Sequence, residues 1–66
     1  MKIRINGRDE TLERPVSLEE LLEEKGLMPE RVVIEYNLEI VSRDRWPRIV
    51  LREGDRVEIV SFVGGG

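Results

Sequence analysis

Gly54-Asp55-Arg56-Val57-Glu58-Ile59-Val60-Ser61-Phe62-Val63-Gly64-Gly65-Gly66 is the stretch that decides the fold. Apolar and polar side chains alternate from Arg56 to Phe62, which is the period of a β-strand with two different faces. Val57, Ile59 and Ser61 fall on one face, and Glu58, Val60 and Phe62 fall on the other. Three glycines follow this strand directly, so the sequence predicts a final strand that runs into a glycine tail.

A hairpin is predicted at the other end of the chain. Residues 2–6 alternate like the final strand, and the turn dipeptide Asn6-Gly7 completes them. Asn-Gly suits a type I′ turn, because both central residues of that turn need positive φ. The return strand is predicted over residues 8–14, where only Leu12 clearly belongs inside, so its register stays open.

One amphipathic helix is predicted after the hairpin. Ser17 is a good N-cap, and Glu20 three residues later completes a capping box. Gly26 supplies a signal for the helix C-terminus. The apolar face of this helix is predicted to consist of Leu18, Leu21 and Leu22.

The segment between the helix and the final strand is predicted to add to the sheet. Residues 32–37 are β-branched and aromatic, which is typical of a central strand. Residues 38–41 continue that strand or return as a short hairpin strand. A brief turn over residues 43–47 and an apolar patch at residues 49–51 come next. The periodicities alone therefore indicate one α+β domain.

The composition excludes several classes of function. The 66 residues suffice for one domain and include no cysteine and no histidine, so thiol and imidazole chemistry and the usual metal ligands are missing. The net charge of −3, with both signs interleaved, does not suggest a nucleic-acid binder. Residues 43–48 place three arginines around Trp46, which we interpret as a turn whose tryptophan covers the edge of the core. With no membrane-spanning stretch and no signal-peptide pattern, we expect a cytoplasmic protein without metal, cofactor or membrane partner.

The glycine tail offers a chemistry that needs no reactive side chain. Glycine lacks Cβ, so it can lie extended in a narrow channel and leave a terminal carboxylate open to reaction. Such a carboxylate becomes an acyl donor once an ATP-using partner converts it to an adenylate. A frayed tail without function is the plainer alternative. We expect residues 64–66 to be flexible and to carry the carboxylate into a partner's active site.

The whole chain resembles the ThiS family of sulfur carriers in bacterial thiamine biosynthesis. The matching pieces occur in order along the chain, and the ending is the strongest of them. They are Met1-Lys2-Ile3, Asn6-Gly7, residues 17–22, Gly26-Leu27, residues 29–32, Asn37, residues 39–41, Trp46, Leu51, residues 54–60 and residues 62–66. Leu38 is a departure, because family members often have Asn-Gly where this chain has Asn37-Leu38.

The resemblance implies a fold and a mechanism. The fold is a single β-grasp (ubiquitin-like) domain over residues 1–63, a mixed sheet with one main helix on one face. A ubiquitin-activating-like adenylyltransferase (ThiF-like) would adenylate the carboxylate of Gly66, with Gly64 and Gly65 entering its active site. Sulfur derived from cysteine would replace the adenylate, and the thiocarboxylate would donate sulfur to a thiazole synthase (ThiG-like). The chain itself would be no enzyme, and a monomer when free.

A docking face for such partners is predicted beside the tail. Val60 and Phe62 alternate with core positions, so a sheet that is covered on one side leaves them exposed. An exposed apolar patch usually marks an interaction site. We therefore expect Val60 and Phe62, together with Tyr36 or Ile40, to bind partners.

Other functions stay open at this point. The same fold and Gly-Gly ending serve carriers for molybdopterin, cysteine and tRNA thiolation, and also protein modifiers that form isopeptide bonds. A plain binding module with an idle tail is an alternative from another class. An enzyme with a carboxylate site such as Glu35 and Asp55 is a further one, although only generic residues suggest it.

Overall fold

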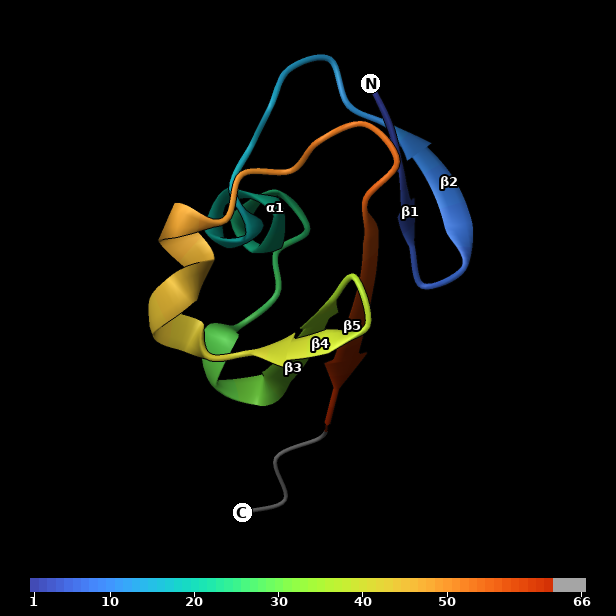
Figure 1. Ribbon diagram of the computed structural model, residues 1–66. Coiled ribbons are helices and arrows are strands. Elements are labelled where there is room, and N and C mark those ends of the chain that lie inside the picture. Colours follow the sequence, from blue (N-terminus) through green and yellow to red (C-terminus); the bar gives the residue numbers. More distant parts are fainter. Residues whose placement is uncertain (63–66) are drawn as a thin grey trace.

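Five strands, one α-helix and two short 3₁₀ segments make up residues 1–62, the part of the chain that the computed structural model describes (Figure 1). The strands are β1 (Lys2–Ile5), β2 (Arg8–Thr11), β3 (Val32–Tyr36), β4 (Glu39–Val41) and β5 (Arg56–Ser61). The helix is α1 (Leu18–Glu24), and the 3₁₀ segments are η1 (Pro29–Arg31) and η2 (Arg43–Arg48). The predicted α+β class is confirmed.

The strands form one mixed sheet in the order β2-β1-β5-β3-β4. β1 and β5 pair in parallel, with Ile5 opposite Val57, and the other neighbours are antiparallel. The first and last strands are therefore adjacent at the centre, as expected of a β-grasp domain. Residues 38–41 return as a hairpin strand, because β3 and β4 are joined by the two-residue turn Asn37-Leu38.

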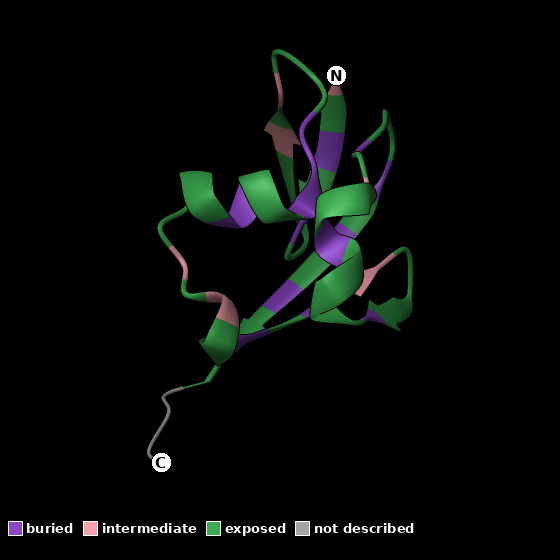
Figure 2. Ribbon diagram, turned by 90° about the vertical axis from the view of Figure 1, so that its left-hand side faces the viewer, coloured by how far each residue is buried: buried purple, intermediate pink, exposed green. Residues whose placement is uncertain are grey.

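The core lies between one face of the sheet and the two helical segments α1 and η2, which sit on the same side of it (Figures 1 and 2). The predicted apolar face of α1 is buried in full. The buried hydrophobic residues are Ile3, Ile5, Val16, Leu18, Leu21, Leu22, Val32, Ile34, Val41, Trp46, Leu51, Val57 and Ile59. Among residues 1–62, no helix lies on the opposite face of the sheet, and most side chains of that face are exposed.

Local sequence signals act as predicted at the helix and at the first turn. Ser17 Oγ accepts a hydrogen bond from the Glu20 amide (3.1 Å), and Glu20 Oε1 accepts one from the Ser17 amide (2.9 Å). This capping box lowers the pKa of Glu20, chiefly because the Ser17 amide donates to its charged form. Asn6 and Gly7 take φ values of 51° and 78°, as a type I′ turn requires.

Two predictions need correction in detail. β2 ends at Thr11 and not at residue 14, and Leu12 beyond it is half-buried against the core. Trp46 lies within the core and not at its edge, and its indole N–H donates to the carbonyl of Val41 (3.2 Å). A buried ring cannot stack on a nucleic-acid base, so Trp46 and the arginines around it do not form a stacking platform.

No helix within residues 1–62 is long and apolar enough to cross a membrane.

Candidate functional site

The end of β5 fixes where the tail begins. The Phe62 amide donates to the carbonyl of Arg31 (2.9 Å), which extends the β3–β5 ladder by one bond beyond the strand itself. Phe62 is therefore held on the folded body. The predicted tail residues Gly64, Gly65 and Gly66, and Val63 before them, lie outside the described residues.

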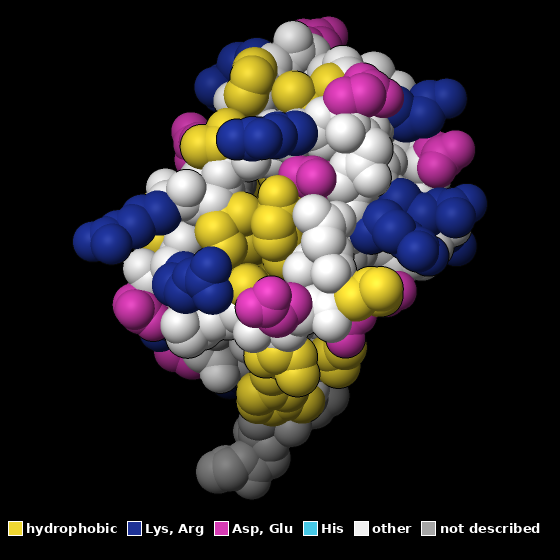
Figure 3. All heavy atoms as spheres, in the orientation of Figure 1, with side chains coloured by type: hydrophobic (Ala, Val, Ile, Leu, Met, Phe, Trp, Pro, Cys, Tyr) yellow, Lys and Arg dark blue, Asp and Glu magenta, His cyan; other side chains and the backbone are white. Residues whose placement is uncertain are grey.

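An apolar patch covers the uncovered face of the sheet at the end where β5 finishes. Val60 is opposite Val33 of β3, and Ile40 of β4 lies diagonally beside Val33. Phe62 continues the alternation of β5 and joins the same face. We call Val33, Ile40, Val60 and Phe62 the apolar patch; they are 39%, 69%, 60% and 49% exposed. Hydrophobic side chains gather at this end of the molecule in Figure 3.

The structure brings three of the four predicted docking residues together and excludes the fourth. Tyr36 is opposite the buried Val57 and packs against the core, so it lies on the covered face of the sheet. The reason is the period of two along β3, which turns Tyr36 inward because Ile34 is inward. Val33 was missed, since three successive apolar residues in β3 hide the alternation. Its place in the patch follows from its position opposite Val60, which only the strand pairing reveals.

Tyr36 instead belongs to a hydrogen-bond network around Asp55, which is only 9% exposed. Asp55 Oδ2 accepts from the Tyr36 hydroxyl (2.7 Å) and from the Arg52 amide (2.8 Å). Asp55 Oδ1 accepts from Asn37 Nδ2 (3.2 Å). These bonds fasten the β3–β4 turn to the start of β5. Glu35 faces the uncovered side of β3, so it does not form the suggested carboxylate site with Asp55.

The Tyr36 hydroxyl should titrate above its ordinary range. Burial raises the pKa of Tyr36 above 10.0, and the hydrogen bond to Asp55 and its negative charge raise it further. A raised folded-state pKa means that this stabilisation is present below pH 10 and is lost as the pH rises through the folded-state value. We expect the alkaline fall in the free energy of unfolding to be shallower in Tyr36→Phe. Tyr36 is the chain's only tyrosine, so ultraviolet absorbance of its phenolate gives the titration directly; an ordinary midpoint would contradict the prediction.

Acidic and basic side chains occupy separate parts of the rest of the uncovered face. Glu35 and Glu58 are directly opposite one another beside the apolar patch, an arrangement in which like charges repel. Arg4 and Arg56 are opposite one another at the far end of the same face. Neither glutamate has an ion-pair partner within 4.0 Å among residues 1–62. The face therefore changes from apolar to acidic to basic with distance from the tail.

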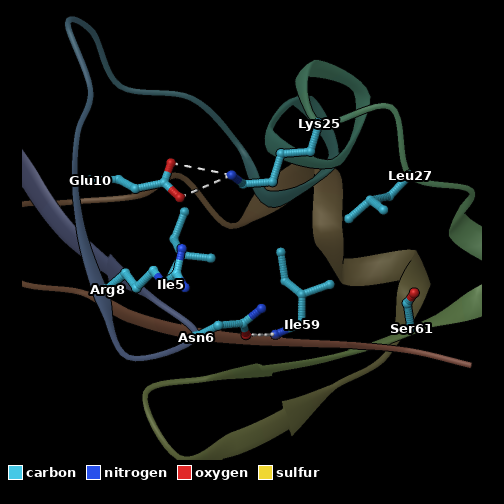
Figure 4. Close-up of a pocket in the computed structure, with 8 residues that line it drawn as sticks. All are labelled: Ile5, Asn6, Arg8, Glu10, Lys25, Leu27, Ile59 and Ser61. Carbon is cyan, nitrogen blue, oxygen red and sulfur yellow. Dashed lines mark hydrogen bonds and ion pairs between the residues drawn. The ribbon is translucent and has the colours of Figure 1, made fainter.

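A groove between the first hairpin and the end of α1 is less suited to a ligand. The groove is lined by Ile5, Asn6, Arg8, Glu10, Lys25, Leu27, Ile59 and Ser61 (Figure 4). Three of its polar side chains already have partners: Lys25 Nζ donates to both carboxylate oxygens of Glu10 (3.0 and 3.2 Å), and Asn6 Oδ1 accepts from the Ile59 amide (2.7 Å). Across the described part of the chain, no three acidic side chains gather to hold a metal ion. The apolar patch is therefore the stronger candidate.

Known proteins are similar to this chain over nearly its whole length. The sequence model of the ThiS family matches residues 3–66. The sulfur carrier protein ThiS of Bacillus subtilis is 34% identical over 65 residues, which are 97% of this chain and 98% of that protein. A crystal structure of a thiamine biosynthesis protein, ThiS, from Geobacter metallireducens superimposes over the full length of both chains, with a TM-score of 0.85 and 30% identity.

Longer proteins also contain a segment like this chain. A thiazole synthase of Magnetococcus marinus is 44% identical over all 66 residues, and one of Paramagnetospirillum magneticum is 39% identical. The chain spans only 20% of the length of each of these two proteins. The match of the family model over almost the entire sequence, together with the shared fold, shows that this chain belongs to the ThiS family.

Proposed function

We propose that this protein is a sulfur carrier for thiazole formation in thiamine biosynthesis and that its working group is the carboxylate of Gly66. The observation that carries the proposal is that the family match extends through Gly66, so the glycine ending belongs to the shared sequence. The apolar patch supports it, because exposed apolar side chains lie where the tail begins, at Phe62. A partner that docks on this patch has the tail within reach.

The proposed chemistry takes place on the tail and is supplied by a partner. A carboxylate oxygen of Gly66 attacks the α-phosphorus of ATP, giving an acyl adenylate and pyrophosphate. A sulfide-level sulfur atom derived from cysteine then attacks the acyl carbon, and AMP leaves with the bonding electrons. The product is a thiocarboxylate, in which one oxygen of the terminus has become sulfur. The folded body contributes docking and orientation, which convert an encounter into a positioned reaction.

Two partners are proposed. The first is a ubiquitin-activating-like adenylyltransferase, which binds the apolar patch and receives Gly64 and Gly65 in the channel that leads to its ATP. The second is a thiazole synthase, which accepts the sulfur. Support for the second comes from the two thiazole synthases that contain a segment similar to this chain within one longer protein. Glycines suit both channels, because a residue without Cβ passes where others collide.

Intact-mass measurement tests the proposal. The protein is incubated with ATP, a sulfur source and a thiamine-pathway adenylyltransferase, beside a variant that lacks Gly65 and Gly66. We expect a mass increase equal to the exchange of one oxygen for one sulfur, located at Gly66 by fragmentation and missing from the variant. An enzyme that modifies its own carrier but leaves this chain unchanged would contradict the proposal. High-mass conjugates would instead indicate a protein modifier.

A further inference from the structure

The turn between β3 and β4 is held in a conformation that its second residue disfavours. Asn37 and Leu38 have φ values of 48° and 73°. The same protein contains the low-energy version of this turn, because Asn6 and Gly7 adopt nearly the same angles. Glycine takes a positive φ without penalty, whereas leucine brings its Cβ against its own backbone there. Leu38 therefore lowers the free energy of unfolding relative to a glycine at this position.

Leu38 gains nothing from packing that would offset this cost. It is 77% exposed, the highest value among the exposed large hydrophobic residues of the described chain. The turn keeps its shape through Asn37: its side chain donates to Asp55 (3.2 Å) and accepts from the Arg56 amide (2.9 Å). An exposed leucine in a strained backbone is doubly unfavourable in the free protein. Such a residue suggests a role outside the folded monomer.

The position of Leu38 relates it to the apolar patch. Phe62 is opposite Arg31 and Asn37 is opposite Arg56, so the end of β5 and this turn are six residue steps apart along the chain from Arg31 to Asn37. At about 3.4 Å per residue, that distance is about 20 Å. The patch covers the part of this distance from Phe62 through Val60 to Ile40, and Glu35 and Glu58 lie beside its end. A partner of ordinary interface size that covers the patch therefore reaches as far as Leu38.

We propose that Leu38 is a second anchor for the thiazole synthase and inserts into an apolar pocket on that enzyme. This inference rests on the proposed function and specifies one contact of its sulfur-acceptor step. The thiazole synthase is the chosen partner because segments similar to this chain occur within proteins of that name. Two contacts about 20 Å apart, at Phe62 and Leu38, would fix the orientation of the folded domain on the enzyme. Contact through the patch alone would let the domain rotate about the patch.

The test uses the full chain with Leu38→Gly, and Leu38→Asn as a second variant that also tolerates positive φ. We expect the glycine variant to melt roughly 4–8 °C higher, because the strain at φ 73° is removed. Thiocarboxylate formation by the adenylyltransferase should keep its wild-type rate. Affinity for thiazole synthase, measured by calorimetry, should fall about tenfold in both variants, as expected when one buried leucine contact is lost. Val50→Ala, which removes an exposed apolar side chain elsewhere, should change neither the rate of thiocarboxylate formation nor the affinity for thiazole synthase.

Each outcome distinguishes this inference from the proposed function. Unchanged affinity in both Leu38 variants would overturn the second anchor while leaving the sulfur carrier intact. Slower thiocarboxylate formation with unchanged affinity for thiazole synthase would also overturn it, because the pocket would then belong to the adenylyltransferase. Wild-type protein that gains no sulfur would reject the proposed function itself. A lower melting temperature in Leu38→Gly would show that Leu38 serves the fold.

Discussion

Phe62→Glu is expected to reduce adenylation of the chain about 100-fold or more while leaving the domain folded. Phe62 precedes the tail, its amide donates to the Arg31 carbonyl, and it is the residue of the apolar patch that comes nearest to Gly66 in the sequence. A glutamate there would put a charge into an apolar contact and would add to the neighbouring acidic pair Glu35 and Glu58. Truncating or charging a central apolar anchor is among the most costly changes in an interface. The rate of adenylate formation is measured from the pyrophosphate that is released.

Val50→Glu is the matched control for this change. Val50 is an exposed apolar residue with the same 49% exposure as Phe62, but it bridges to Ser17 at the start of the helix. The control therefore adds the same charge at the same degree of exposure, away from the apolar patch. Fluorescence of the buried Trp46 monitors the fold of both variants. Equal loss of adenylation in the two variants, or an unfolded Phe62→Glu, would reject the docking face.

Asp55→Ala is expected to lower the free energy of unfolding by about 3 kcal/mol. Asp55 is the acceptor for three donors, the Tyr36 hydroxyl, Asn37 Nδ2 and the Arg52 amide. Alanine would leave these donors without their partner in a site with little access to water. The loss is severe for so short a chain, because small domains have a thin margin of stability. Urea denaturation followed by Trp46 fluorescence measures it.

Asp9→Ala makes the same substitution where the aspartate is exposed. Asp9 pairs with Arg4 across the first hairpin at 3.6 Å, and more than half of its side chain is in solvent. Exposed ion pairs contribute little, so this variant should lose less than about 1 kcal/mol. Similar losses in the two variants would show that the network around Asp55 has no special weight. A loss of unfolding free energy that is confined to Asp55→Ala would show that the stabilisation comes from the buried network.

The elements that could be predicted from the sequence are those encoded by neighbouring residues. The capping box of Ser17 and Glu20 and the positive φ of Asn6 and Gly7 each depend on residues that are at most three apart. The alternation along β5 likewise identified Val60 and Phe62 as exposed without any knowledge of their neighbours. Local periodicity and turn chemistry are sufficient for such features.

The features that escaped prediction depend on pairing between distant strands. β2 is polar on both faces, so its length and register follow only from its ladder with β1. The inward side of Tyr36 is set by its position opposite Val57, and the buried network joins it to Asp55, 19 residues later. Nothing in the residues next to Asp55 indicates that its carboxylate accepts three hydrogen bonds. A long-range contact gives no periodic signal in a single sequence.

The central position of β5 has a consequence for the synthesis of this protein. Each hairpin, β1–β2 and β3–β4, pairs with β5, and neither pairs with the other. A nascent chain that has not yet released Val57 and Ile59 from the ribosome therefore has two separate hairpins and an incomplete core. Pairing of residues as distant as Ile5 and Val57 is slow compared with local contacts. Folding is thus completed by the last strand, and a chain that ends before Val57 lacks both the central strand and the core residues Val57 and Ile59.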